Sequence, residues 1–211
     1  YICKWLQSLA KKKYSYRIIF VPETIGSIAY LSKNYKYMKK KIVAGFNISC
    51  IGDDKNYSFL PSKQGNTLSD EVAKHVLSWT DKNYKFYNWS ERGSDERQYC
   101  SPGIDLPIAS VMRTKYGEYK EYHTSLDNLK NVVTPKGLEG GFVLIKRIIE
   151  ALENNYFPRT KILCEPQLSK HNLYPTLSRR NSSREARIFL DLISYSDGHT
   201  SLLNIAKKIN V

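Results

Sequence analysis

Three acidic residues, a histidine and an arginine in polar turns are the side chains of this sequence best suited to chemistry. His123 and Asp127 lie together in YHTSLDN, Asp95 and Arg97 lie in GSDERQY, and Glu23 lies in VPETIG. An imidazole in a polar loop, just beyond an apolar run and near a carboxylate, is a place where zinc can bind. A lone histidine in a loop is also commonly a solvated surface residue. The residue types alone leave both interpretations open.

Glu23 is a candidate because of the element that precedes it. The apolar run Tyr16–Val21 (YRIIFV) predicts a strand buried on both faces, Pro22 ends it, and a helix is predicted from Ile25 to Ser32. Ligands of open α/β sheets bind at the carboxyl ends of strands, which favours a functional role for Glu23. The alternative is an acidic residue that only stabilises the first turn of a helix.

The other apolar patterns predict the elements that position these side chains. A buried strand is expected at Leu106–Met112, between the turns that hold Asp95 and His123. Further strands are expected at Lys41–Ile51, Tyr57–Leu60 and, at a sheet edge, Lys85–Tyr87. Helices are expected at residues 2–13, Leu68–Thr80 and Pro135–Asn154, and the second of these has Val72, Val76 and Trp79 on one apolar face. Such alternation predicts an α/β domain with a mixed sheet.

The composition of the sequence changes after Pro158. Residues 158–182 contain three prolines and a Ser- and Arg-rich end, which indicates a linker or crossing segment. Two amphipathic helices, Ser183–Tyr195 and Ser201–Ile209, follow around the turn at Gly198. This arrangement is typical of the start of a helix-turn-helix or winged helix, and we expect the recognition helix to lie beyond Val211.

Composition limits the classes of function. The chain has 211 residues and a net charge of +13. Hydrophobic residues make up 41% and charged residues 25%, which indicates a globular protein, and since no apolar run approaches 18 residues, no transmembrane helix is expected. Its four cysteines are far apart in sequence, which favours a reduced cytoplasm over a disulfide framework. The positive charge suits nucleic acid, but Lys residues spread over the whole chain are equally compatible with a solvated surface.

Three segments together resemble one bacterial family. They are YRIIFVPETIGSIAYLSKN, RGSDERQYCSPGIDLPIASVMRT and YGEYKEYHTSLDNL. They resemble uncharacterised aminopeptidase-like domain proteins with a C-terminal winged helix, a family similar to the zinc aminopeptidases and glutaminyl cyclases of the zinc-exopeptidase superfamily. The resemblance covers essentially the whole chain. It implies a three-layer α/β domain over residues 1–157, a linker at 158–182 and a truncated winged-helix segment at 183–211.

The resemblance also implies roles for individual residues. Glu23 matches the region of a Glu-Glu pair, in which the first residue is the general base and the second a zinc ligand. Pro22 stands at the first position, so Glu23 is expected to be the ligand, although the opposite alignment makes it the base. His123 matches the last zinc-binding histidine. Asp95 matches a segment that lines the substrate pocket and can act on a reacting group, and Arg97 suggests an anionic group on the substrate.

The same resemblance shows two departures. Ser49 stands where two-metal members have an aspartate ligand, which favours one zinc ion. The first ligands of the superfamily precede the Glu motif, so we expect the chain to be a fragment whose remaining ligands lie elsewhere in a longer polypeptide. Tyr99 or Tyr122 can stabilise an oxyanion, although either can also be a packing residue. Asp95 or Asp127 can act as the base or hold the free amine of the substrate, and Asp127 can equally fix the imidazole ring of His123.

The resemblance therefore predicts a cytoplasmic zinc-dependent hydrolase that cleaves a peptide or other amide next to a free amine. Its partner is a peptide or an amino-bearing small molecule, and a homo-oligomer is compatible with the sequence. The alternative is a catalytically degenerate aminopeptidase fold that binds DNA or regulates through its winged helix. Pro22 and Ser49 support this alternative, whereas Glu23, Asp95 and His123 support the enzyme.

Overall fold

The computed structural model describes residues 1–171, 173 and 182–211. The chain divides into two units, Tyr1–Glu153 and Asn154–Val211. The first unit contains a four-stranded sheet in the order β1-β4-β2-β3. Its strands are β1 (Gly45–Ile48), β2 (Ser58–Leu60), β3 (Lys85–Phe86) and β4 (Ile108–Met112). The predicted mixed sheet is confirmed, because β4 pairs in parallel with β1 and antiparallel with β2.

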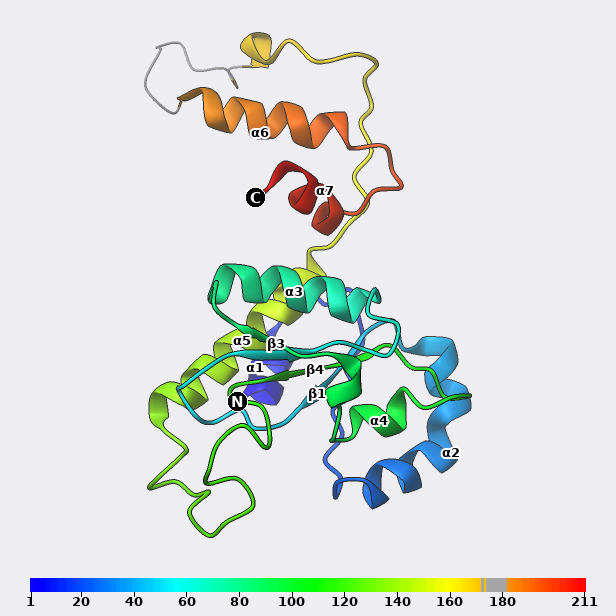
Figure 1. Cartoon of the computed structure of the whole chain (residues 1–211). Helices are drawn as coiled ribbons and strands as arrows, with labels where there is room; N and C mark the ends of the chain where they lie inside the picture. The colour runs from blue at the N-terminus through cyan, green and yellow to red at the C-terminus, as the bar shows by residue number, and fades with distance from the viewer. Residues whose placement is uncertain (172, 174–181) are drawn as a thin grey trace. The chain divides into compact units, whose positions relative to one another are not determined.

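Helices cover both faces of this sheet. They are α1 (Ile2–Ser8), α2 (Ile25–Lys41), α3 (Leu68–Thr80), α4 (Glu96–Tyr99) and α5 (Pro135–Glu153). Figure 1 shows α3 and α5 on one side of the sheet and α2 and α4 on the other. The predicted α/β class, with a sheet between layers of helices, is therefore confirmed.

The central strand β4 is apolar because both of its faces are covered. All five of its residues are buried. One side of the core includes Leu77 of α3 and Leu144 and Ile148 of α5, which are fully buried or nearly so. On the other side, Leu31 and Met38 of α2 belong to a hydrophobic cluster that also contains Ile108. This packing fixes the ends of β4, where the candidate site lies.

Helix α3 has the predicted bounds because its start is encoded locally. The side chains of Thr67 and Asp70 form a capping box, which satisfies amide groups of the first turn. Val72 and Val76 are buried as expected. Trp79, which was predicted on the same apolar face, is 64% exposed, so that part of the prediction is wrong.

The predicted strand Tyr16–Val21 is wrong, because this segment pairs with no strand of the described chain. The segment starts beside α5, where the Tyr16 hydroxyl donates to Glu153, and it ends at the first turn of α2. Its residues belong to no helix or strand. The predicted strand Lys41–Ile51 is shorter than expected, since α2 continues to Lys41 and only Gly45–Ile48 joins the sheet.

The second unit contains the helices predicted near the C-terminal end. They are α6 (Ser182–Ser194) and α7 (Leu202–Ile209), and a short helical turn that was not predicted, η2 (Leu168–His171), lies in the expected linker. Ser201 caps α7 by accepting a hydrogen bond from the amide of Asn204, and Leu203 and Ile205 are buried. Much of the predicted linker's second half, residues 172 and 174–181, lies outside the described residues. None of the described helices has the length and hydrophobicity needed to cross a membrane.

Candidate active site

The candidate site lies beyond the carboxyl ends of the parallel strands β1 and β4. The ladder between them continues past the strands, where the amide of Arg113 donates to the Cys50 carbonyl at 2.9 Å. The loop 49–57 follows β1, and the loop 113–134 follows β4. Parallel strands bring their following loops to the same sheet edge, where ligands of α/β proteins bind.

Thr24 joins the loop of Glu23 to the loop of Asp95 and Arg97. The Thr24 amide donates to Oδ1 of Asp95 at 2.7 Å, and Nη2 of Arg97 donates to the Thr24 hydroxyl at 2.8 Å. We call these two hydrogen bonds the clasp. Thr24 has a left-handed φ of 61°, a conformation that non-glycine residues seldom adopt. The clasp brings Glu23, an exposed residue, beside the half-buried Asp95, two residues that are far apart in sequence.

Glu96 anchors the loop that carries the clasp. Its carboxylate is fully buried and accepts five hydrogen bonds. Burial opposes ionisation of this carboxyl, but the amides of Ser94 and Gly93 keep its pKa below the ordinary value. The other donors are Asn47 of β1, Ser110 of β4 and Tyr116. Both parallel strands therefore hold the loop that presents Asp95 and Arg97.

Glu96 was not predicted as a functional or structural residue. Its sequence position gave a weak signal, because Tyr99 and Cys100 follow at three and four residues and are also buried. These spacings place the three side chains on one face of a helical turn. A charged residue on an apolar face of so short a helix does not stand out in a sequence.

His123 and Tyr122 approach the same edge from the loop after β4. Their rings stack with centroids 4.0 Å apart, and His123 is exposed and has a left-handed φ of 58°. Burial raises the pKa of the Tyr122 phenol, and the carboxylates of Glu23 and Asp127 add to this effect. Tyr122 packs against a hydrophobic cluster that contains Met112, the last residue of β4, and Tyr116, whose hydroxyl donates to Glu96 next to the clasp residue Asp95.

Asp127 is bound to a tyrosine in this structure. The Tyr119 hydroxyl donates to Asp127 Oδ2 at 2.8 Å and also contacts the sulfur of Cys50 at 3.7 Å. Burial raises the pKa of the Cys50 thiol, which stays protonated at neutral pH. Within the described residues Asp127 makes no hydrogen bond to His123, whose ring stacks on Tyr122, and the role of Asp127 in fixing that ring stays a prediction.

Tyr99 differs from the other predicted site residues. It is buried in the hydrophobic cluster of Leu31, Met38 and Ile108, and burial raises its pKa. Its ring therefore serves packing on the α2 side of the sheet. Ser49 is half-buried directly after β1, where its hydroxyl donates to the Cys50 sulfur at 3.7 Å.

The described residues do not form a complete metal centre. Within residues 1–171, 173 and 182–211, no three His, Cys, Asp or Glu side chains are grouped so that they could hold a metal ion. Glu23 and His123 remain candidate ligands, but a catalytic zinc ion needs about three protein ligands. Zinc therefore does not fit this set of residues alone.

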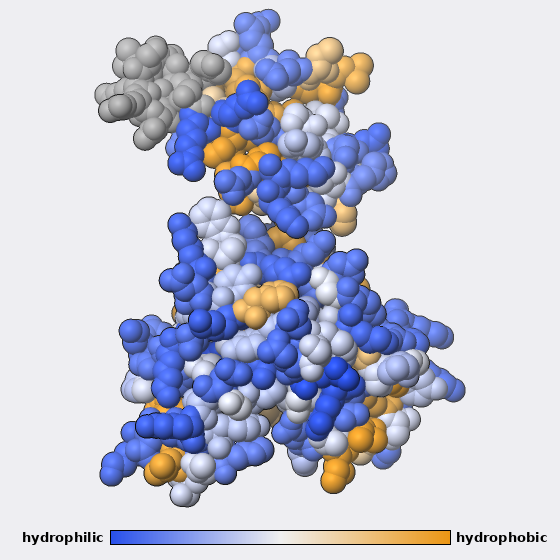
Figure 2. Space-filling model, in the orientation of Figure 1, coloured by the Kyte–Doolittle hydropathy of each residue, from blue (hydrophilic) through white to orange (hydrophobic). Residues whose placement is uncertain are grey.

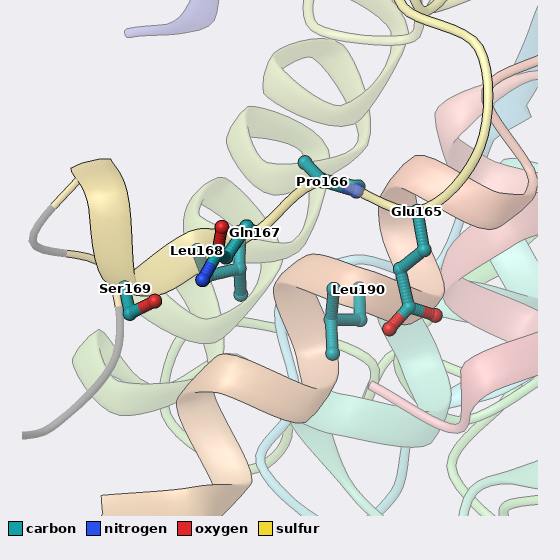
Figure 3. A pocket seen from close by; sticks show the side chains of 6 residues that line it. All are labelled: Glu165, Pro166, Gln167, Leu168, Ser169 and Leu190. Atoms are coloured by element: carbon teal, nitrogen blue, oxygen red, sulfur yellow. The ribbon is translucent and has the colours of Figure 1, made fainter.

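A hollow of about 360 Å³ lies in the second unit, apart from these residues. Figure 3 shows its lining from the segment before and within η2 and from Leu190 of α6. Its side chains are mostly apolar or amide, with one carboxylate from Glu165. It contains no histidine or cysteine, so we assign it no chemistry.

Residues 1–155 match a family described as a domain of unknown function (DUF4910), and residues 156–211 match a winged helix-turn-helix family. A protein of Clostridium acetobutylicum, named "Putative polysaccharide biosynthesis protein with aminopeptidase-like domain", is 38% identical over 99% of this chain and 48% of its own length. The chain thus spans about half the length of this relative.

One solved structure supports the fold of the whole chain. The crystal structure of a "putative peptidase" from Clostridium acetobutylicum is 37% identical, with a TM-score of 0.86 over 100% of this chain and 46% of its own. An aminopeptidase from Aneurinibacillus sp. strain AM-1 is 14% identical over 61% of this chain and 30% of its own, with a TM-score of 0.49. Since the first match extends over residues 1–155, the chain belongs to the family described as a domain of unknown function (DUF4910).

Proposed function

We propose that this chain forms part of the active site of an aminopeptidase-type hydrolase, which cleaves a peptide or other amide next to a free amine. The observation that carries the proposal is the clasp, which brings Glu23 beside Asp95 and Arg97 at the edge that Tyr122 and His123 also approach. The names of the Clostridium acetobutylicum relatives support the same class of reaction.

Asp95 and Arg97 are suited to binding the substrate. Oδ1 of Asp95 accepts from Thr24, whereas Oδ2 has no hydrogen bond within the described part of the chain. A half-buried carboxylate oxygen of this kind can accept hydrogen bonds from a substrate ammonium group. Arg97 is exposed and uses one Nη for Thr24, which leaves further N–H groups for an anionic group. The preferred substrate carries both a free amine and an anionic group.

Tyr122 is suited to stabilising charge that develops during the reaction. Because burial raises its pKa, the phenol remains protonated at neutral pH and can donate a hydrogen bond to an oxyanion. Glu23 is exposed at the same edge and is either a metal ligand or the base that takes a proton from the attacking water.

We further propose that the complete protein binds one zinc ion, with Glu23 and His123 as two of its ligands. The described residues supply no third ligand beside them, so the proposal requires donors outside residues 1–211. No step of the reaction is assigned to zinc from these residues.

The test measures zinc content and hydrolysis of aminoacyl amides by the longest polypeptide that contains these residues. We expect near one equivalent of zinc in the wild type, and its loss in Glu23→Ala and His123→Ala. The control is His199→Ala, which removes an exposed histidine of the second unit. A folded wild type without zinc, or zinc retained in both site variants, would overturn the metal assignment. Hydrolysis by a wild type that contains no zinc would support the proposed hydrolase and contradict the proposed zinc site.

A regulatory protein is the second candidate, because residues 156–211 match a winged helix-turn-helix family and the chain has a net charge of +13. This alternative expects binding of duplex DNA that weakens steeply with salt. It also expects that His123→Ala leaves DNA binding unchanged. Absence of DNA binding at low salt would exclude it.

A further inference from the structure

We infer that residues 17–21 form a docking strand, which pairs with a β-strand of polypeptide outside residues 1–211. The pairing partner belongs to the half of the protein that corresponds to the part of the longer relatives this chain does not span. This inference concerns assembly and does not depend on the proposed reaction.

The backbone of the docking strand is unpaired. Residues 17–21 make no backbone–backbone hydrogen bond with any residue that the structure describes. Their sequence, RIIFV, has the β-branched and aromatic composition of a strand. A row of free N–H and C=O groups in such a segment is a template for a further strand.

The docking strand is held at both ends. Before it, the Tyr16 hydroxyl donates to Glu153, and Arg17 donates to the Tyr30 hydroxyl at 3.0 Å. After it, Pro22 and Val21 pack on Gly26, where a Cβ atom would come within 2.8 Å of both side chains. Anchoring at both ends lowers the entropy that a partner strand must overcome when it binds.

Large apolar side chains around the docking strand are exposed to solvent. Ile18 is 44%, Phe20 86%, Ile25 79% and Ile28 50% exposed, and we call these four residues the apolar strip. Ile25 and Ile28 lie on one exposed face of α2, three residues apart. Figure 2 shows hydrophobic surface over the part of the first unit where α2 begins. Contiguous exposed apolar groups of this kind mark an interaction surface.

Charge and length identify the occupant. The two Clostridium acetobutylicum chains are about twice as long as this chain, which covers 48% of the polysaccharide biosynthesis protein and 46% of the solved peptidase chain. A second copy of the chain is disfavoured, because residues 11–41 contain one acidic residue, Glu23, and like charges would face each other. The basic residues of that stretch are Lys11, Lys12, Lys13, Arg17, Lys33, Lys36, Lys39, Lys40 and Lys41. The partner strand should therefore be apolar with acidic flanks.

The experiment co-expresses residues 1–211 with the half of the Clostridium acetobutylicum relative that this chain does not span. We expect a 1:1 complex by light scattering, and at least tenfold slower hydrogen exchange at the amides of residues 18–21. The double variant Phe20→Asp and Ile25→Asp should weaken the complex at least tenfold. Trp79→Asp is the matched control, because Trp79 is a 64% exposed apolar residue on α3 of the same unit.

A further variant separates backbone pairing from side-chain contact. Ile19→Pro removes one amide of the docking strand, and it should weaken the complex while leaving the circular dichroism spectrum unchanged. Two results would overturn the inference. One is exchange at residues 18–21 that is equally fast with and without the second polypeptide. The other is a homodimer of residues 1–211 with the same amides protected, which would make a second copy the occupant.

Discussion

Replacing Glu96 with glutamine tests how the loop of Asp95 and Arg97 is held in place. The Glu96 carboxylate is 0% exposed, and Gln has nearly the same shape, so the change removes charge and acceptor capacity without opening a cavity. Oε1 accepts from Gly93 N at 2.9 Å, Ser94 N at 3.0 Å and Tyr116 Oη at 3.0 Å, and Oε2 accepts from Asn47 Nδ2 at 2.9 Å and Ser110 Oγ at 3.0 Å.

The magnitude follows from which partners the amide can keep. The Gln oxygen is expected to keep the Oε1 partners, since two of them are fixed backbone amides. Its NH₂ group would then face Asn47 and Ser110. The Ser110 hydroxyl can turn and accept. The Asn47 amide loses the Glu96 acceptor and keeps only its longer contact with Ser110 Oγ at 3.4 Å, which costs about 1–3 kcal/mol. The remaining hydrogen bonds become neutral and weaker. We expect a total loss of about 2–4 kcal/mol of unfolding free energy.

Urea unfolding followed by tryptophan fluorescence measures this loss in the right part of the chain. All three tryptophans, Trp5, Trp79 and Trp89, lie in the first unit. Glu139→Gln is the control, because Glu139 is exposed on α5, and it should change the stability by less than about 0.5 kcal/mol. A loss below about 1 kcal/mol in Glu96→Gln, with an unchanged denaturant slope, would refute the idea that Glu96 anchors the loop.

The pH dependence provides an independent check of the same reasoning. The folded-state pKa of Glu96 lies below its ordinary value of 4.5, so its contribution to stability is present above that pH and is lost as the pH falls through the folded pKa. The stability difference between the wild type and Glu96→Gln should therefore shrink as the pH is lowered below 4.5. A difference that stays constant down to the acid transition would contradict the assignment.

Two further changes test the packing and the cysteines. Gly→Ala in a helix usually stabilises a protein by up to about 1 kcal/mol. Gly137→Ala in α5 should instead destabilise the first unit by more than about 1 kcal/mol in urea unfolding, because the new Cβ would lie 2.0 Å from the Gly52 carbonyl oxygen. A stabilised variant would show that the loop of Gly52 moves freely. Iodoacetamide at neutral pH should modify the exposed Cys164 well before Cys50 and Cys100, because burial raises the pKa of these two thiols. Peptide mass spectrometry measures the order of modification. Modification of Cys50 before Cys164 would argue against the buried contacts of the Cys50 thiol.

Elements that are encoded locally were predicted well from the sequence. The bounds of α3 follow from a capping box and a helical period of apolar residues, both within 14 residues of sequence. The central strand and α5 were found because their apolar runs are long and end at turns. The expectation that Glu23 follows the carboxyl end of a strand rested on Tyr16–Val21, which is no strand in the structure, so the functional role of Glu23 stays a prediction.

Features that depend on long-range contacts were not predicted. The clasp joins residues about 70 positions apart, and no pattern in either segment indicates that Thr24 bridges them. Glu96 appears in the sequence as one charge among several, and only the fold shows that strands β1 and β4 both donate to it. Tyr16–Val21 has the composition of a strand, but composition does not reveal whether a partner strand is available.

Glu23, a candidate ligand of the incomplete zinc site, lies two residues after the unpaired docking strand. This closeness in sequence leads to a prediction that links metal binding to docking. Glu23 lies between Phe20 and Ile25 of the apolar strip, so polypeptide that pairs with residues 17–21 comes close to the candidate ligand. If that polypeptide also supplies metal ligands, the double variant Phe20→Asp and Ile25→Asp should lower zinc content in the co-expressed complex, although it removes no ligand. Trp79→Asp should leave zinc content unchanged. Full zinc content in a double variant that no longer forms the complex would separate docking from metal binding, and it would show that residues 1–211 hold the metal by themselves.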